Sequence, residues 1–111
     1  MIIFAIEMAY IQCKLQIITT TRYFVTVFED ERPKDDSIFS VKLLDHTTAR
    51  QVLDNLVHNI VDFGGSRVKK TNNSVMFYIE APPSHIVENV ISDIELITFN
   101  CMEYMQYCKL I

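Results

Sequence analysis

The sequence predicts an α+β fold, an antiparallel sheet with two helices on one of its faces. Three patterns predict it: two amphipathic helical stripes, strand-like alternation around them, and the order in which these segments follow one another. Each stripe repeats at i, i+1, i+4, i+5 and i+8, which gives a helix one apolar side and suits packing against a sheet. The stripes are Val52-Leu53-Leu56-Val57-Ile60-Val61 and Ile86-Val87-Val90-Ile91-Ile94.

Length, charge and cysteine content limit the class of protein. A chain of 111 residues, half of them hydrophobic, can bury the core of one domain, so we expect a single domain over 1–111. The net charge of -4 argues against a protein whose main task is to coat nucleic acid or an anionic membrane. Cys13, Cys101 and Cys108 form no CxxC pair, so we expect neither a disulfide framework nor a zinc site, and a reducing, cytoplasmic location.

Residues 1–28 predict an N-terminal β-hairpin extension. The apolar stretch 1–9 has no positively charged leader, carries Glu7 and is too short for a membrane span, so we expect a strand there. Period-2 alternation over 11–17 and the β-branched and aromatic run 23–28 predict the two paired strands of the hairpin.

The rest of the chain divides into a loop and a regular unit. Residues 29–36 carry charges of both signs around Pro33 and predict a solvated loop. Residues 37–111 predict a β-α-β-β-α-β unit. Its expected elements are strands at 38–44, 67–70, 74–80 and 96–107, a helix from Thr48 to Phe63, and a helix from Ser84 to Ile94.

The ends of these elements have their own signals. Thr48 and Gln51 are spaced for a capping box, and Ser84 can cap the second helix. The glycine pair at 64–65, the only glycines in the chain, predicts the end of the first helix, because glycine readily takes the left-handed conformation. Residues 71–73, Thr-Asn-Asn, predict a tight turn between two strands.

The β-α-β-β-α-β order resembles that of ferredoxin-like folds, which implies right-handed crossovers that place both helices on one face of the sheet. This resemblance is one of order alone. Because unrelated functions share that order, it implies no activity.

The predicted strands are apolar in both of their alternating phases. Val75, Phe77 and Ile79 alternate with Met76 and Tyr78, a pattern typical of strands buried on both faces. Two helices cover only one face, so the second face needs another cover: the N-terminal hairpin, a second copy of the chain, or a different protein. This requirement favours a homodimer or a protein partner.

The main functional hypothesis is therefore a non-enzymatic interaction or regulatory protein that acts through an apolar sheet face or edge. The sequence offers no catalytic constellation, and we predict no catalytic residue, cofactor or metal site. The isoleucine- and methionine-rich, tryptophan-free composition resembles that of proteins from AT-rich genomes, including many viral ones. A viral or mobile-element inhibitor of a host protein is one form of this hypothesis.

A single-stranded nucleic-acid-binding domain is the first alternative. A basic hairpin tip could contact phosphates, and sheet aromatics could stack on bases. The net charge and the lack of a basic-Gly-aromatic run argue against it. The residues concerned are Arg67, Lys69, Lys70, Asn72, Phe77 and Tyr78.

A small-anion sensor is the second alternative. Asp45, His46, Thr47 and Thr48 lie where a strand leads into a helix. Free N–H groups and the helix dipole can bind an anion at such a position, and a histidine there can carry a proton near neutral pH.

Overall fold

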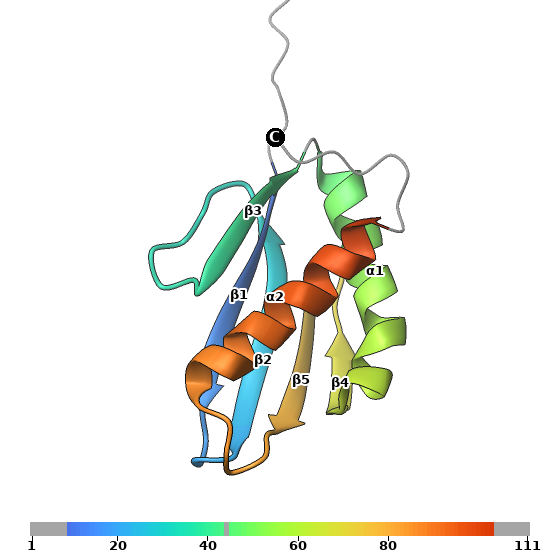
Figure 1. The fold of residues 1–111 in the computed structure, drawn as a ribbon. Coiled ribbons are helices and arrows are strands. Elements are labelled where there is room, and N and C mark those ends of the chain that lie inside the picture. Colours follow the sequence, from blue (N-terminus) through green and yellow to red (C-terminus); the bar gives the residue numbers. More distant parts are fainter. Residues whose placement is uncertain (1–8, 44, 104–111) are drawn as a thin grey trace, which may run out of the picture.

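A computed structural model describes residues 9–43 and 45–103 of the chain and confirms an α+β fold. One five-stranded sheet, in which every neighbouring pair is antiparallel, packs with two helices (Figure 1). The elements are β1 (Ala9–Ile17), β2 (Arg22–Asp30), β3 (Phe39–Leu43), α1 (His46–Phe63), β4 (Gly65–Lys70), β5 (Ser74–Glu80) and α2 (Val87–Glu103). Residues 1–8, which include most of the strand predicted at 1–9, lie outside the described residues.

The strand order is β3-β1-β2-β5-β4, so the ferredoxin-like order is not confirmed. The hairpin of β1 and β2 was expected as an extension or a cover, but it forms the centre of the sheet. Cys13 on β1 pairs with both Val27 on β2 and Phe39 on β3, and Val25 on β2 pairs with Phe77 on β5. The physical reason is burial: these strands carry some of the most completely buried apolar side chains, and a central position removes them from water on both edges.

The strand predicted at 96–107 is wrong over its described part, because α2 continues to Glu103. Val90, Ile94 and Cys101 are all buried at helical spacing. The hydroxyl of Thr98, also buried, donates to the Ile94 carbonyl at 2.8 Å and so stays satisfied inside the helix. Packing of this apolar side overrides the strand propensity of the β-branched and aromatic residues around Thr98. Residues 104–107 lie outside the described part of the chain.

Both helix starts differ from the predicted caps. Asp45, rather than Thr48, is the N-cap of α1: its Oδ1 accepts a hydrogen bond from the Thr48 backbone N–H at 2.7 Å. Helix α2 begins at Val87 rather than near Ser84, and the N–H of Ile86 donates to Oδ1 of Asn89.

The end of α1 is confirmed at the glycine pair. Gly64 has φ +97°, and its N–H bonds the carbonyls of Ile60 and Val61, a geometry that closes the helix. Gly65 then starts β4 so close to α1 that an added Cβ would meet Ile60 Cγ2. The turn at 71–73 and the strand at 74–80 are also confirmed.

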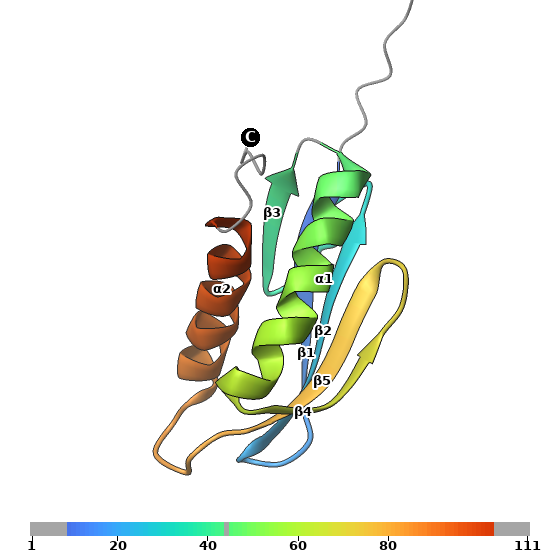
Figure 2. The same cartoon turned by 90° about the vertical axis from the view of Figure 1, so that its right-hand side faces the viewer.

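Both helices lie on the same face of the sheet, as Figure 2 shows from the side. The core lies between these two layers. Its fully buried larger side chains are Ile11, Val25, Val27, Leu43, Val52, Leu53, Leu56, Ile60, Val75, Phe77 and Ile94.

Candidate binding face of the sheet

The two phases of each strand have different fates. On β2, Val25 and Val27 face the helices and are fully buried, whereas Phe24, Thr26 and Phe28 point the other way and are half-buried. Among residues 9–43 and 45–103, no helix packs on that other side. We call it the open face. By strand register it comprises Tyr10, Gln12, Lys14, Gln16, Arg22, Phe24, Thr26, Phe28, Asp30, Ser40, Lys42, Ser66, Lys69, Ser74, Met76, Tyr78 and Glu80. Arg67 is added to it because its guanidinium approaches the Tyr78 ring.

Aromatic rings and cations interleave on the open face. Phe24 and Tyr78 are cross-strand partners whose ring centroids lie 5.0 Å apart with an interplanar angle of 48°. The guanidinium of Arg22 lies 4.7 Å from the Tyr78 ring centroid, and the ammonium of Lys14 lies 5.5 Å from that of Phe28. These are cation–π distances, so the rings hold positive charge beside them.

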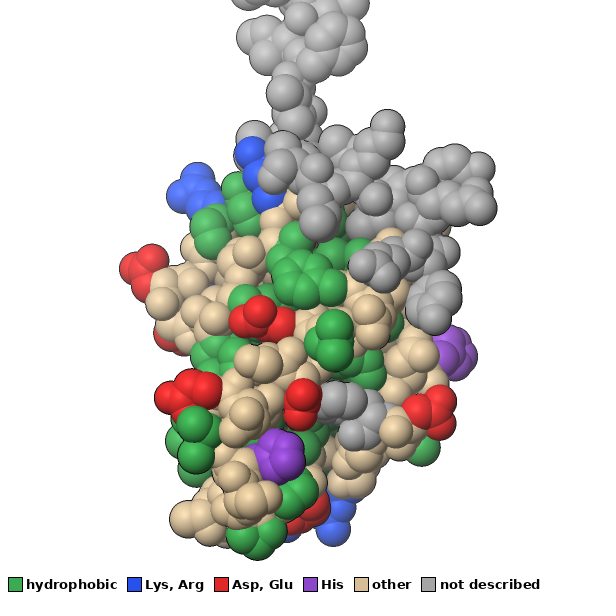
Figure 3. All heavy atoms as spheres, viewed as in Figure 1, with side chains coloured by type: hydrophobic (Ala, Val, Ile, Leu, Met, Phe, Trp, Pro, Cys, Tyr) green, Lys and Arg blue, Asp and Glu red, His purple; other side chains and the backbone are tan. Residues whose placement is uncertain are grey.

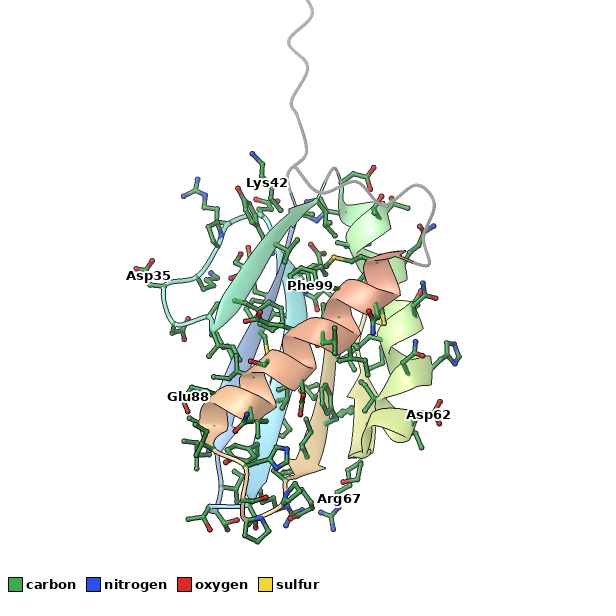
Figure 4. All side chains as sticks on the ribbon, in the orientation of Figure 1. Asp35, Lys42, Asp62, Arg67, Glu88 and Phe99 are labelled. Carbon is green, nitrogen blue, oxygen red and sulfur yellow. The ribbon has the colours of Figure 1, made fainter. Side chains whose placement is uncertain are left out.

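A second guanidinium reaches Tyr78 from β4, where the pairing with β5 shifts register between Ser66 and Lys69. Arg67 lies in this irregularity with φ +53°, the only positive φ of a residue other than glycine in the described ranges. Its guanidinium is 6.0 Å from the Tyr78 ring centroid. Figure 4 shows Arg67 at one end of the sheet, beside β4. A left-handed conformation is costly for arginine, and such strain is concentrated at functional sites.

Cations outnumber carboxylates on the open face. The cations are Lys14, Arg22, Lys42, Arg67 and Lys69. The carboxylates are Asp30 and Glu80 on the strands and Asp36 from the β2–β3 loop, whose Oδ2 lies 3.1 Å from Lys14 Nζ. Arg22 Nε lies 3.2 Å from Glu80 Oε1 but without hydrogen-bonding geometry, so this contact is only an ion pair. Lys42 and Lys69 have no ion-pair partner within the described ranges.

The helical layer has the opposite charge. Arg50 is the only lysine or arginine on α1 and α2. Carboxylates at the surface of these helices are visible on the side shown in Figure 3, where red side chains lie over the helices and blue ones lie at the margins. The exposed or half-exposed carboxylates of the two helices are Asp54, Asp62, Glu88, Asp93 and Glu95. The net charge of -4 thus averages an acidic helical layer and a basic sheet face.

The β2–β3 loop borders one side of the open face. Gln12 points from β1 into this loop and is fully buried: its Nε2 donates to the Arg32 carbonyl, and its Oε1 accepts from the Lys34 N–H and the Ser37 hydroxyl. The charged side chains of the loop are exposed as predicted, but the loop backbone is anchored. Next to it lies a hollow of about 370 Å³, lined by Lys14, Leu15, Gln16, Phe24, Thr26 and Asp36.

The residues predicted to bind nucleic acid are divided between the two faces. Arg67, Lys69 and Tyr78 come together on the open face. Phe77 points into the core with no exposed area, so it cannot stack on a base, and Lys70 pairs with Asp54 of α1 at 2.8 Å. Asn72 is exposed in the turn after β4.

Sequence reasoning missed Arg22, Phe24, Phe28 and Lys14 as site residues. A signal was present, because Arg22, Phe24, Thr26 and Phe28 occupy one phase of a strand whose other phase is Tyr-Val-Val. The run 23–28 was interpreted only as a paired strand, and neither of its phases was assigned to a site.

At the predicted anion site, the chain's own carboxylates lie close to the helix start. The Thr48 N–H is bonded to Asp45, and this bond holds the pKa of Asp45 below its usual range. His46 Nδ1 lies 2.6 Å from Oε2 of Glu29, and Arg50 Nε lies 3.5 Å from Oε1. The exposed Thr47 adds only a hydroxyl-bearing side chain. An external anion would have to displace Asp45 and approach Glu29, so this helix start is a poor anion site.

Glu29 is itself a correction to the predicted loop at 29–36. It belongs to β2, continues the buried phase, and is only 6% exposed. Its partners on α1 explain how a carboxylate tolerates that burial.

The two described cysteines are not activated nucleophiles. Burial raises the pKa of the Cys13 thiol to about 12, with a smaller contribution from the charge of Glu95. Burial also raises the pKa of Cys101, although Asn59 donates to its sulfur and opposes the shift. Within residues 9–43 and 45–103 there is no group of three or more side chains placed to hold a metal ion.

No protein-family model, curated protein or solved structure matches this chain. In the described ranges, neither helix combines the length and the apolarity needed to cross a bilayer.

Proposed function

We propose that this protein is a non-enzymatic binding protein that holds an extended anionic partner on the open face of its sheet. The observation that carries the proposal is the segregation of charge: cations gather on the open face, and carboxylates dominate the helical layer. Such a distribution attracts a polyanion to one side of the molecule and repels it from the other.

The charge of the open face changes the partner that the sequence favoured. An apolar face would suit a protein partner or a second copy of the chain. Instead, Lys14, Gln16 and Thr26 lie between the aromatic residues, and the aromatic side chains Phe24, Phe28 and Tyr78 are each only half-buried. The excess of cations beside these rings favours a partner that carries negative charge.

Retention on immobilised heparin, a polyanion without rings that stack as bases do, tests this proposal. Lys69 and Lys70 are neighbours in sequence but face opposite sides of the sheet. Lys69→Gln and Lys70→Gln each remove one positive charge, so the two variants differ only in the face that loses it. We expect Lys69→Gln to elute at lower salt than both the wild type and Lys70→Gln, because only Lys69 meets the polyanion. Equal elution of the two variants, or no retention of the wild type, would contradict the proposal.

Self-association is a second candidate, and one specific surface favours it. Ile17 and Ile18, at the β1–β2 turn, are 61% and 44% exposed, and Ile86 is 61% exposed. The turn and the segment after β5 lie together, since the Ala81 N–H donates to the Thr21 carbonyl at 2.7 Å. Sedimentation of the wild type against Ile17→Ser/Ile18→Ser tests it: a dimer that the substitutions dissociate is expected, and a concentration-independent monomer contradicts it.

A further inference from the structure

We infer that the anionic partner is single-stranded nucleic acid, with its bases stacked on Phe24, Tyr78 and Phe28. This inference rests on the proposed function of the open face and adds a ligand class to it. Its basis is the combination of rings and cations on one face of the sheet, because cations alone would serve any polyanion.

Three aromatic rings lie at the surface of the open face. Phe24 and Tyr78 lie side by side on β2 and β5, and Phe28 lies further along β2, all half-buried on the open face. Aromatic side chains contribute most to folding when they are fully buried, as Phe77 is. Rings kept at a surface give splayed bases a platform, because every base has a π-face.

Cations lie close to two of these rings. Arg22 and Arg67 both lie near the ring of Tyr78, at 4.7 and 6.0 Å, and Lys14 lies near that of Phe28. Because these cations lie over the rings, a base would stack on the Arg22 guanidinium or take its place on the Tyr78 ring, and in either position its phosphate lies within reach of a cation. A guanidinium can also stack on a base, which an ammonium does not do.

The backbone of Arg67 is strained at the point where its side chain approaches Tyr78. Its φ of +53° places a costly conformation at the one position of β4 that brings a second guanidinium to Tyr78. Glycine would fit that backbone without strain, and a lysine or arginine elsewhere on β4 would serve solubility equally well. The coincidence of strain with a ring contact is what a binding role explains.

The shape of the ligand follows from the same surface. Bases in a duplex are stacked on one another and present only their edges in the grooves, so a duplex cannot stack them on rings at the surface of a sheet. A duplex, like heparin, would be held through its charges alone. Single strands should therefore bind more tightly than a duplex of the same sequence.

Fluorescence anisotropy at fixed salt separates the ring contribution from the charge contribution. The probes are a labelled single-stranded DNA 12-mer of mixed sequence, the same sequence as RNA, the matched DNA duplex, and labelled heparin. The ring variants are Phe24→Leu and Tyr78→Leu, which keep an apolar side chain but remove the ring. The charge variant is Lys69→Gln, with Lys70→Gln as its matched control, and urea unfolding verifies that each variant is folded.

We expect each ring variant to lose about tenfold in affinity for at least one of the two single strands and to bind heparin as the wild type does. Lys69→Gln should weaken every probe and lower the slope of log affinity against log salt by about 0.7 for single strands, whereas Lys70→Gln should not.

The outcomes distinguish the two proposals. If heparin binds through Lys69 but single strands bind no better than the duplex, or the ring variants bind them normally, base stacking is overturned and polyanion binding stands. If no probe binds the wild type, both proposals fail. Loss of single-strand affinity in the ring variants, with heparin affinity unchanged, supports both.

Discussion

The two faces of this sheet are built from the same strands and yet differ in burial and in charge. Phe77 and Tyr78 are adjacent in β5, but the first is fully buried against the helices and the second lies on the open face between two guanidiniums. The comparison teaches that one phase of each strand supplies the stability of the fold. The other phase carries the rings and most of the sheet's cations, and its one fully buried member in the described residues, Gln12, anchors the β2–β3 loop.

The largest expected difference between the faces concerns the chemistry of Cys13, which lies on the covered side. Burial raises the pKa of this thiol from 9.0 to about 12, so at pH 8 its thiolate fraction is about a thousandfold lower in the native protein than in the unfolded chain. Iodoacetamide should therefore modify Cys13 slowly in buffer and rapidly in urea, as measured by peptide mass spectrometry.

The raised pKa also sets a direction for stability against pH. Because the folded pKa exceeds the unfolded value, the contribution of Cys13 is complete below about pH 9 and is lost as pH rises toward 12.

In the alkylation experiment, modification of Cys13 by iodoacetamide in buffer at the rate seen in urea would show that the covered face is open to solvent.

The next largest effect is a matched pair of truncations in β5. Phe77→Ala should lower the free energy of unfolding by about 3–5 kcal/mol, because it leaves a cavity in the core. Tyr78→Ala removes a half-buried ring from the open face and should cost about 1 kcal/mol or less. Urea unfolding measures both. Equal losses of unfolding free energy would show that the open face stabilises the fold as much as the covered face does.

A smaller effect belongs to the start of the helical layer. Asp45→Ala removes the carboxylate that bonds the Thr48 N–H and should cost about 1 kcal/mol. That bond lowers the pKa of Asp45, so its contribution is present above the ordinary carboxyl pKa and is lost as pH falls below it. The difference in unfolding free energy between wild type and variant should therefore shrink between about pH 5 and pH 2; a constant difference would exclude capping by the ionised group.

The smallest effect has the opposite sign and lies on the open face. Arg67→Gly relieves a left-handed conformation and should raise the free energy of unfolding by about 0.5 kcal/mol. It also removes a cation from beside Tyr78, so affinity for heparin and for single strands should fall. A variant that gains stability and loses affinity would show that Arg67 serves binding at the expense of stability. Loss of stability would show that the Arg67 side chain supports the fold.

The sequence was sufficient for local features that depend on one segment at a time. The alternation in β1 and β2, the apolar side of α1 and the glycine at its end all follow from residue types within a few positions. In α2, the same local signals conflicted. Ile97, Thr98 and Phe99 have high strand propensity, and only packing on the rest of the core decides for a helix.

Features that join distant segments could not be predicted. Glu29 looks like a loop residue until His46 and Arg50 approach it from α1. Likewise, the candidate site combines Phe24 of β2 with Tyr78 of β5, and nothing within either strand specifies that pairing. The average charge misled for the same reason, because it does not show on which layer each charge lies.

The strand order has a consequence for how the chain folds. Helix α1 joins β3 to β4, the two edges of the sheet. Among the described residues, the pairing of β2 with β5 is therefore the only strand pairing between two units, β3-β1-β2 and β5-β4, that form from nearer neighbours in sequence. Non-local pairing of this kind is slow to form, because a long loop must close before the contact is made. We expect the rate-limiting step to be the docking of two preformed hairpin units along this seam, with α1 acting as the tether that keeps them at high effective concentration.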